Sequence, residues 1–118
     1  MSYRPVCRLS DLGESQPRRV EVDGEAVVLV RQGSEVFALD DVCSHAEVSL
    51  AEGDVVDGAI ECWLHGSRFD LATGEPSGPP AFEPVATYPT AVRTDDDGTE
   101  TVAVSVLGST EPASQIRN

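Results

Sequence analysis

The sequence has few of the residues that usually build catalytic, metal-binding or cross-linked sites. Of its 118 residues only two are histidine, three are cysteine and one is tryptophan. Three cysteines make no disulfide framework, and so small a number favours a reducing, cytoplasmic compartment. No stretch approaches the roughly eighteen apolar residues that span a bilayer, and the N-terminus lacks the apolar run of a signal peptide. We therefore expect a cytoplasmic protein without a membrane anchor.

Positive charge is scarce as well. The chain has eight lysine and arginine residues against 21 aspartate and glutamate residues, which gives a formal net charge of −13. Such a charge repels nucleic acids and anionic membranes, so we expect neither as a partner. It attracts a basic docking surface on a protein partner, with an association rate that falls as salt rises. The alternative is a solvated acidic surface that serves solubility alone.

The scarce histidines and cysteines are concentrated in one stretch, residues 43–65. Cys43 and His45 form a Cys-x-His pair, and Cys62 and His65 form a Cys-x-x-His pair. Thiolate and neutral imidazole are ligands of zinc, copper and iron–sulfur centres. Zinc sites of this composition usually group two cysteines before two histidines, whereas here the two types alternate. Alternation suits a 2Fe-2S cluster with both cysteines on one iron and both histidines on the other.

The residues around these four side chains extend the pattern. They include Leu50, Gly53, the run Cys62-Trp63-Leu64-His65-Gly66-Ser67-Arg68-Phe69-Asp70, Thr73-Gly74 and Pro80-Ala81. Together they resemble the Rieske ferredoxins, most of all the ferredoxin components of multicomponent oxygenases and the related ferredoxins found alongside bacterial iron–sulfur assembly proteins. The resemblance implies a Rieske 2Fe-2S cluster held by Cys43, His45, Cys62 and His65.

The resemblance also assigns roles to two residues beside the ligands. Ser67 matches a serine that donates a hydrogen bond to a bridging sulfide, whereas Phe69 stands where high-potential members have a tyrosine. Both ligand turns lack the extra cysteines that form a disulfide in those members. With two thiolates and two neutral imidazoles the oxidised cluster has no net charge, so it accepts an electron more readily than an all-cysteine cluster. We predict a midpoint near the low end of the Rieske range, which a value above about +150 mV would contradict.

Three further residues near the motif or elsewhere in the chain invite an interpretation. Trp63 stands where the family commonly has proline, and would either shield the cluster or simply pack against its neighbours. Arg68 would pair with a neighbouring acid such as Asp70, or mark the edge of a docking surface. Cys7 is far from the motif and has no histidine near it in the sequence, so we expect a small buried apolar residue rather than a ligand.

The chain has the pattern of an all-β domain. Short alternating or β-branched runs are separated by turn signals, among them Asp23-Gly24 and Asp57-Gly58, which are typical of β-hairpins. The hairpin around Asp57-Gly58 would bring the two ligand turns to the same end of the molecule. Residues 84–93 are expected to form one strand and residues 101–106 a closing strand. No long helical pattern is present.

We predict a single Rieske iron–sulfur domain over residues 1–107. It would be built of antiparallel sheets with a small cluster-binding subdomain of loops over about residues 40–82. A polar tail would follow over residues 108–118. By resemblance, Gly78-Pro79-Pro80 would be a third loop that covers the cluster, and the alternative is a rigid connector.

An electron carrier fits the chain better than an enzyme does. Catalytic Rieske oxygenases add a domain with a mononuclear iron, which needs two further histidines and a carboxylate. Here no histidine remains, and the chain is too short. The carrier would receive electrons from a flavin-dependent or other reductase and pass them to a terminal oxygenase, to iron–sulfur assembly proteins or, as a subunit resembling that of nitrite reductase, within that enzyme. Two other classes stay open: a structural zinc-binding module, and a thiol enzyme using Cys62 with His65.

Overall fold

The computed structural model describes residues 3–43, 48–64, 66–77 and 83–106, and its regular elements are almost all strands. Two short 3-10 turns, η1 (Leu9–Asp11) and η2 (Leu50–Glu52), are the only helical elements in these ranges, and none there is long and apolar enough to cross a bilayer. The all-β prediction is confirmed. The strands are β1 (Arg4–Arg8), β2 (Arg18–Val22), β3 (Glu25–Gln32), β4 (Glu35–Asp40), β5 (Asp54–Val56), β6 (Ala59–Glu61), β7 (Arg68–Asp70), β8 (Thr87–Tyr88), β9 (Thr90–Thr94) and β10 (Glu100–Val104).

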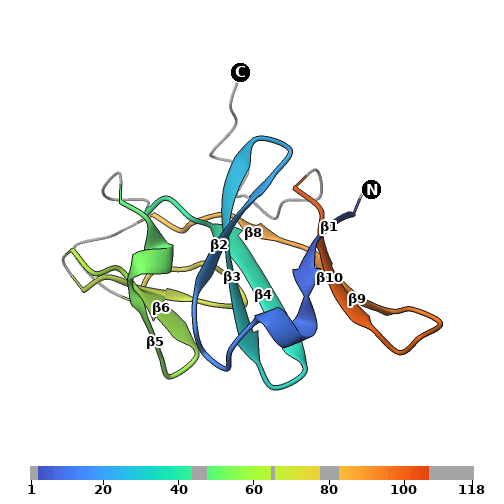
Figure 1. Cartoon of the computed structure of the whole chain (residues 1–118). Coiled ribbons are helices and arrows are strands. Elements are labelled where there is room, and N and C mark those ends of the chain that lie inside the picture. Colours follow the sequence, from blue (N-terminus) through green and yellow to red (C-terminus); the bar gives the residue numbers. More distant parts are fainter. Residues whose placement is uncertain (1–2, 44–47, 65, 78–82, 107–118) are drawn as a thin grey trace.

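The strands form three antiparallel sheets with the orders β2-β3-β4-β8, β1-β10-β9 and β5-β6-β7. In Figure 1 the first of these sheets lies between the other two, with β5 and β6 on one side and β1, β10 and β9 on the other. Two predicted regions, Gly78-Pro79-Pro80 and the tail over residues 108–118, lie outside the described residues.

Both predicted hairpins are confirmed, and the backbone explains their turn residues. Asp23 and Gly24 join β2 to β3 with φ angles of 49° and 84°, and Asp57 and Gly58 join β5 to β6 with 50° and 77°. A two-residue turn with both residues in the left-handed region matches the twist of the strands that it joins. Aspartate tolerates this region better than most residues, and glycine adopts it at no steric cost.

Strand β3 supplies side chains to two hydrophobic cores. Val28 and Val30 pack in a core shared with the β5-β6-β7 sheet, whereas Val27 and Leu29 pack in a core shared with the β1-β10-β9 sheet. Successive residues of a strand point to opposite faces, so a strand covered on both sides must be apolar at every position. This burial explains the uninterrupted apolar run of residues 26–30.

The prediction of one strand over residues 84–93 is wrong. The structure has two strands there, β8 in the central sheet and β9 in the β1-β10-β9 sheet, with Pro89 between them. Proline has no N–H to donate to a ladder, so it favours a break at this point. The chain uses the break to cross from one sheet to another.

Candidate metal centre

The first predicted ligand turn starts where β4 ends and is closed at its base by backbone contacts. Val42 and Ser49 form an isolated antiparallel bridge, and the N–H of Cys43 donates to the carbonyl oxygen of Val48 at 3.0 Å. Cys43 is buried, with 3% of its surface exposed. His45 belongs to residues 44–47, which lie outside the described residues.

The second predicted ligand turn joins β6 to β7 and is tighter. The N–H of Cys62 donates to the carbonyl oxygen of Ser67 at 2.7 Å, and the N–H of Gly66 donates to the carbonyl oxygen of Cys62 at 3.0 Å. Gly66 has a φ of 76°, in the region that favours glycine, which explains the glycine directly after the predicted ligand. Cys62 is fully buried, and His65 lies outside the described residues.

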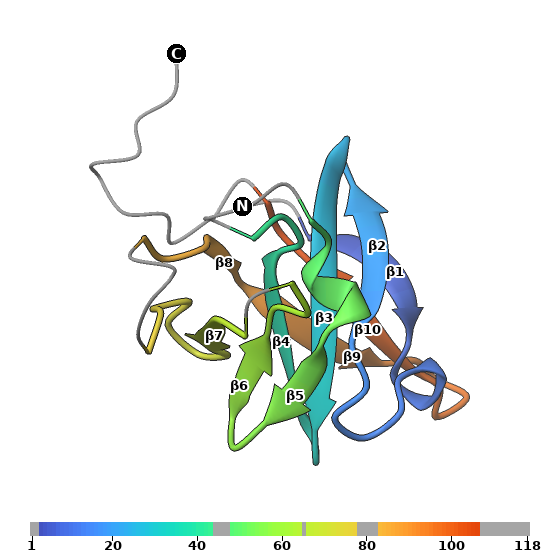
Figure 2. The ribbon, with the colours of Figure 1, turned by 90° about the vertical axis from the view of Figure 1, so that its left-hand side faces the viewer.

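The fold brings the two turns together, as the hairpin prediction requires. Cys43 and Cys62 belong to the same buried cluster, which also contains Ile60 of β6 and Phe69 of β7, and neither thiol is in a disulfide. Figure 2 views this part of the molecule, where β5, β6 and β7 lie in front of the central sheet. No group of three or more ligating side chains occurs among the described residues, which contain only two of the four predicted ligands.

Ser67 tests whether this place suits a cluster. Only 1% of the surface of Ser67 is exposed, and its Oγ has no hydrogen-bond partner among the residues that the structure describes. Burying a hydroxyl without a partner costs free energy, and such groups are rare in folded proteins. Two buried thiols beside an unpartnered hydroxyl fit a group that needs thiolate ligands and offers sulfur acceptors. A 2Fe-2S cluster has both properties.

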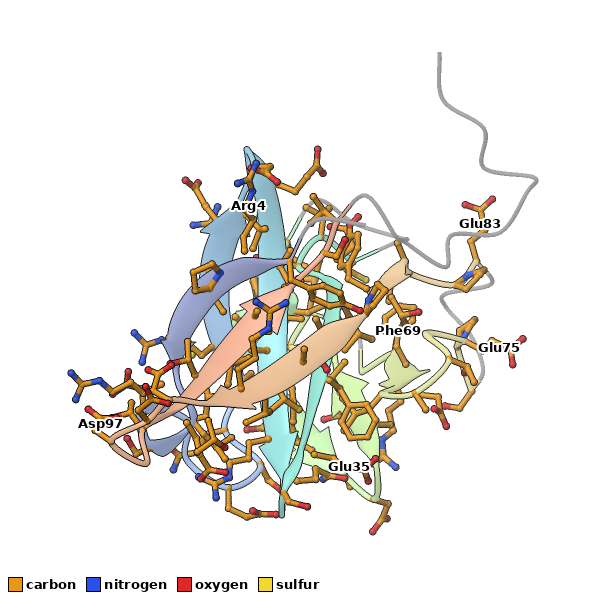
Figure 3. All side chains as sticks on the ribbon, turned by 90° about the vertical axis from the view of Figure 1, so that its right-hand side faces the viewer. Arg4, Glu35, Phe69, Glu75, Glu83 and Asp97 are labelled. Carbon is orange, nitrogen blue, oxygen red and sulfur yellow. The ribbon has the colours of Figure 1, made fainter. Side chains whose placement is uncertain are left out.

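The strand pairing of β7 determines the surroundings of the residues that follow Ser67. Phe69 is completely buried and contributes only an aromatic ring to the cluster of apolar side chains (Figure 3). Arg68 lies opposite Glu61 in the β6–β7 ladder, and its Nε is 2.9 Å from Oε2 of that residue. Arg68 therefore pairs with a neighbouring acid, but that acid is Glu61 across the ladder rather than Asp70. Asp70 lies on the same face of β7 as Arg68, and its carboxylate instead accepts hydrogen bonds from two backbone N–H groups of the turn that follows.

Large apolar side chains are exposed beside both cysteines. Val42 precedes Cys43 and is 44% exposed, while Trp63 and Leu64 follow Cys62 and are 51% and 39% exposed. Half of the Trp63 surface faces solvent, so this side chain is not part of the interior. We call these three residues the apolar tip. Exposed apolar patches beside a functional group are typical of interaction sites.

Asp41 is a residue to which the sequence analysis gave no role. Its side chain is buried at the base of the first ligand turn and accepts two hydrogen bonds from the far end of that turn. The sequence signal that could have identified Asp41 is an acidic residue directly before a predicted ligand turn. If such an acid is buried, it requires hydrogen-bond donors or a counter-charge.

Cys7 lies on β1, distant in the fold from both ligand turns, and packs partly buried against the core shared with the β1-β10-β9 sheet. Burial raises the pKa of its thiol above the ordinary 9.0, with a smaller opposing effect from Arg18. A thiol with a raised pKa is protonated at neutral pH, so it is a poor nucleophile and a poor ligand. These properties agree with the apolar role predicted for Cys7.

We expect the Cys7→Ser variant to keep the absorbance and paramagnetic spectra of the wild-type protein unchanged. We also expect the Cys7 thiol to react slowly with iodoacetamide at pH 7, and to react faster only as the pH rises through its raised pKa. Mass spectrometry of the alkylated peptide measures this rate. Loss of colour in Cys7→Ser would show that Cys7 takes part in the site.

Comparison with known proteins identifies the cofactor of the site formed by the two ligand turns. The family model of the Rieske 2Fe-2S domain matches residues 2–89. The 3-phenylpropionate/cinnamic acid dioxygenase ferredoxin subunit of Photorhabdus laumondii is 39% identical over 106 residues, which cover 89% of this chain and 97% of that relative.

Solved structures agree. The ferredoxin of carbazole 1,9a-dioxygenase from Nocardioides aromaticivorans superposes with a TM-score of 0.78 and 38% identity, over 89% of this chain and 98% of that one. The ferredoxin-oxygenase complex of a carbazole 1,9a-dioxygenase includes a chain with a TM-score of 0.74 and 31% identity, over 87% of this chain and 92% of that one.

The fold and the site thus define a small iron–sulfur protein of the ferredoxin class. The chain belongs to the Rieske 2Fe-2S family, and its cofactor is the Rieske 2Fe-2S cluster. Its relatives are ferredoxin components of aromatic-ring dioxygenase systems, as the resemblance predicted.

Proposed function

We propose that this ferredoxin takes single electrons from a flavin-dependent or other reductase in the cytoplasm and passes them to the terminal oxygenase of an aromatic-ring dioxygenase system. Its ligands are Cys43, His45, Cys62 and His65, within a single domain over residues 1–107. The observation that carries the ligand assignment is the convergence of two buried thiols and the unpartnered hydroxyl of Ser67. The names of the relatives favour an oxygenase over iron–sulfur assembly proteins as the acceptor.

When bound, a Rieske cluster accepts one electron and releases it again without bond rearrangement. The chain supplies the conditions for this exchange. Burial of Cys43 and Cys62 excludes water from the sulfur side, and Ser67 offers a hydroxyl donor there. Phe69 offers no second donor, which keeps the expected midpoint potential low in the Rieske range.

The surface around the ligand turns suits a basic, partly apolar partner. Residues 40–83 contain ten acidic side chains, of which Asp41 is buried, and a single cation, Arg68, which is already paired with Glu61. Figure 3 shows the labelled acids Glu75 and Glu83 on the outside of this part of the molecule. Acidic charge around the apolar tip gives long-range attraction, and the tip gives short-range contact.

Trp63 is expected to be the anchor of the docked complex. Tryptophan is among the residues that most often dominate the binding energy of an interface. We expect Trp63→Ala to raise the KM of the oxygenase for the reduced ferredoxin about tenfold or more, a loss of roughly 1.4 kcal/mol, with the midpoint potential unchanged. Steady-state oxygenation at varied ferredoxin concentration measures this effect.

The matched control is Val92→Ala. Val92 is also a large apolar side chain exposed on the surface, at 37%, but it lies on β9 in the sheet on the other side of the molecule. Its replacement should leave the KM at the wild-type value. Equal KM values for Trp63→Ala and the wild type would remove Trp63 from the docking surface.

Ser67→Ala is expected to lower the midpoint potential. A hydroxyl that donates to a cluster sulfur stabilises the reduced, more negative form more than the oxidised one. Loss of about 1 kcal/mol of this difference corresponds to roughly 40 mV for one electron. The matched control is Ser105→Ala, since Ser105 Oγ is the other buried hydroxyl without a partner among the described residues. If both variants titrate like the wild type, Ser67 does not donate to the cluster.

The proposed function is tested by electron transfer between purified proteins. Protein reduced with dithionite is mixed anaerobically with oxidised terminal oxygenases of aromatic-ring dioxygenases, including that of carbazole 1,9a-dioxygenase. The spectrum of the ferredoxin reports its reoxidation. We expect transfer to at least one oxygenase at a rate that saturates with concentration and falls as salt rises. An intact, reducible protein that transfers to none of them would contradict the proposal.

A further inference from the structure

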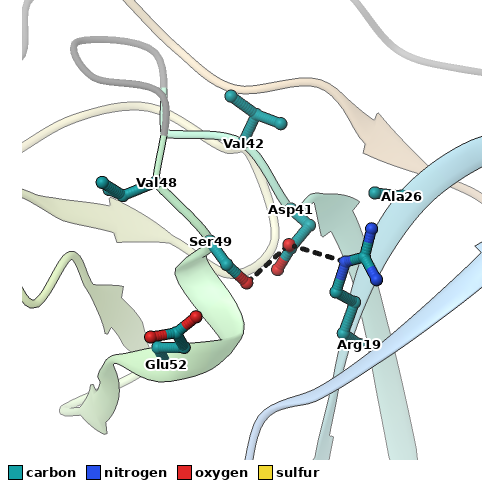
Figure 4. A pocket seen from close by; sticks show the side chains of 7 residues that line it. All are labelled: Arg19, Ala26, Asp41, Val42, Val48, Ser49 and Glu52. Carbon is teal, nitrogen blue, oxygen red and sulfur yellow. Dashed lines mark hydrogen bonds and ion pairs between the residues drawn. The ribbon is translucent and has the colours of Figure 1, made fainter.

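The structure contains one buried acid whose contacts join the first ligand turn to the central sheet. Figure 4 shows Asp41 between Arg19 of β2 and Ser49, in a pocket that Val42 and Val48 of the ligand turn also line. Only 3% of the Asp41 side chain is exposed. Burying a carboxylate costs free energy unless hydrogen bonds and a counter-charge surround it. The contacts of Asp41 therefore indicate which segments of the chain it holds in place.

The carboxylate holds the far end of the ligand turn. Oδ2 of Asp41 accepts a hydrogen bond from Ser49 Oγ at 2.6 Å, and Oδ1 accepts one from the N–H of Ala51 at 2.9 Å. The main-chain carbonyl of the same residue accepts a third from the N–H of Leu50 at 2.6 Å. These three bonds tie residue 41, before the turn, to residues 49–51, after it.

The other contacts of Asp41 reach the central sheet. Its N–H donates to the carbonyl oxygen of Ala26 on β3 at 3.1 Å, and Arg19 Nε lies 3.3 Å from Oδ2. Arg19 is half exposed, so it supplies the counter-charge from the solvent side of the pocket. One residue therefore connects two strands of the sheet with both ends of the turn.

We infer that Asp41 is a positioning residue for the cluster. By fixing both ends of the loop over residues 42–49, it sets where Cys43 stands relative to Cys62, and so sets the geometry in which the cluster is held and how firmly it is retained. The inference rests on the proposed ligand set. It concerns the contacts of the chain itself, since Asp41 is not proposed as a ligand.

The test compares cluster retention and the paramagnetic spectrum of loaded variants. Asp41→Ala removes both side-chain acceptors, and we expect it to lose iron to a chelator at least tenfold faster than the wild type, with shifted and broadened signals after reduction. Asp41→Asn keeps an acceptor for Ala51 and an amide that can donate to Ser49, and it loses the ion pair with the half-exposed Arg19. It should restore the wild-type spectrum and bring the loss rate within a few-fold of the wild-type value.

General destabilisation is separated by Val102→Ala. Val102 is fully buried in the core shared with the β1-β10-β9 sheet, so its truncation lowers stability without touching the ligand turns. It should leave the spectrum unchanged. A spectrum and a loss rate for Asp41→Ala no different from those of Val102→Ala would overturn the inference.

Ser49→Ala covers the case in which Asp41→Ala does not fold. It removes one of the two side-chain bonds, so we expect iron loss at least twofold faster and a smaller spectral shift of the same kind. A Ser49→Ala protein identical to the wild type, beside an Asp41→Ala protein that does not fold, would also overturn the inference. If the wild type itself showed no two-histidine cluster, the proposed function would fail instead.

Discussion

Replacement of His45 by alanine is expected to abolish the Rieske spectrum of the protein. The proposed ligand set gives each iron two side-chain ligands, so loss of His45 leaves one iron with a single imidazole. We expect iron and acid-labile sulfide to fall to background, or the cluster to convert to a species with a different spectrum. Visible absorbance, paramagnetic resonance and metal analysis of anaerobically purified protein measure the change.

The result also separates the remaining alternatives. A thiol enzyme that used Cys62 with His65 would be little changed by loss of His45. A structural zinc site would be colourless before and after the substitution, and would lose zinc rather than iron. The control is Cys7→Ser, which removes the one cysteine outside the proposed ligand set and should keep full colour. An unchanged Rieske spectrum in His45→Ala would remove His45 from the ligand set.

Gly53→Ala is expected to give the second large effect, on stability. Gly53 has an ordinary φ of −93°, so glycine is not needed there for its backbone conformation. An added Cβ would overlap the carbonyl oxygen of Glu61, the residue directly before Cys62. Strand β5 would have to move away from β6. We expect a loss of roughly 2–3 kcal/mol in the free energy of unfolding and a fall in Tm of about 10 °C.

Gly13→Ala is the matched control for this substitution. Its added Cβ would meet only the side chain of Gln16, which is flexible and can turn away. The two variants carry the same chemical change, so the difference between their Tm values in thermal unfolding reports the close approach at Gly53. Equal Tm values for the two variants would contradict the described packing of β5 against β6.

Much of the fold was predictable from local signals. The turns at Asp23-Gly24 and Asp57-Gly58 were recognisable because few other residue pairs adopt two successive left-handed conformations. The β-branched run of residues 26–30 indicated a strand, and the structure adds that this strand is buried on both sides. The four ligands were assigned from spacing and resemblance, and the structure describes two of them, both buried and both in one cluster of side chains.

What the sequence did not predict depends on contacts between segments far apart in the chain. Within residues 84–93, Pro89 is a local signal for a break, but no local signal shows that the two halves join different sheets. The partner of Arg68 is chosen by the β6–β7 register, which a single strand does not reveal. The role of Asp41 depends on Arg19 and Ser49, which become its neighbours only when the sheet and the ligand turn meet.

The central claim is that four side chains of this chain hold a 2Fe-2S cluster with two histidines on one iron. Paramagnetic resonance of anaerobically purified protein, before and after reduction with dithionite, tests it most directly. We predict a red-brown protein that is silent when oxidised and that, when reduced, gives a signal with an average g-value clearly below that of all-cysteine ferredoxins. A colourless, silent protein that carries one zinc would contradict the account.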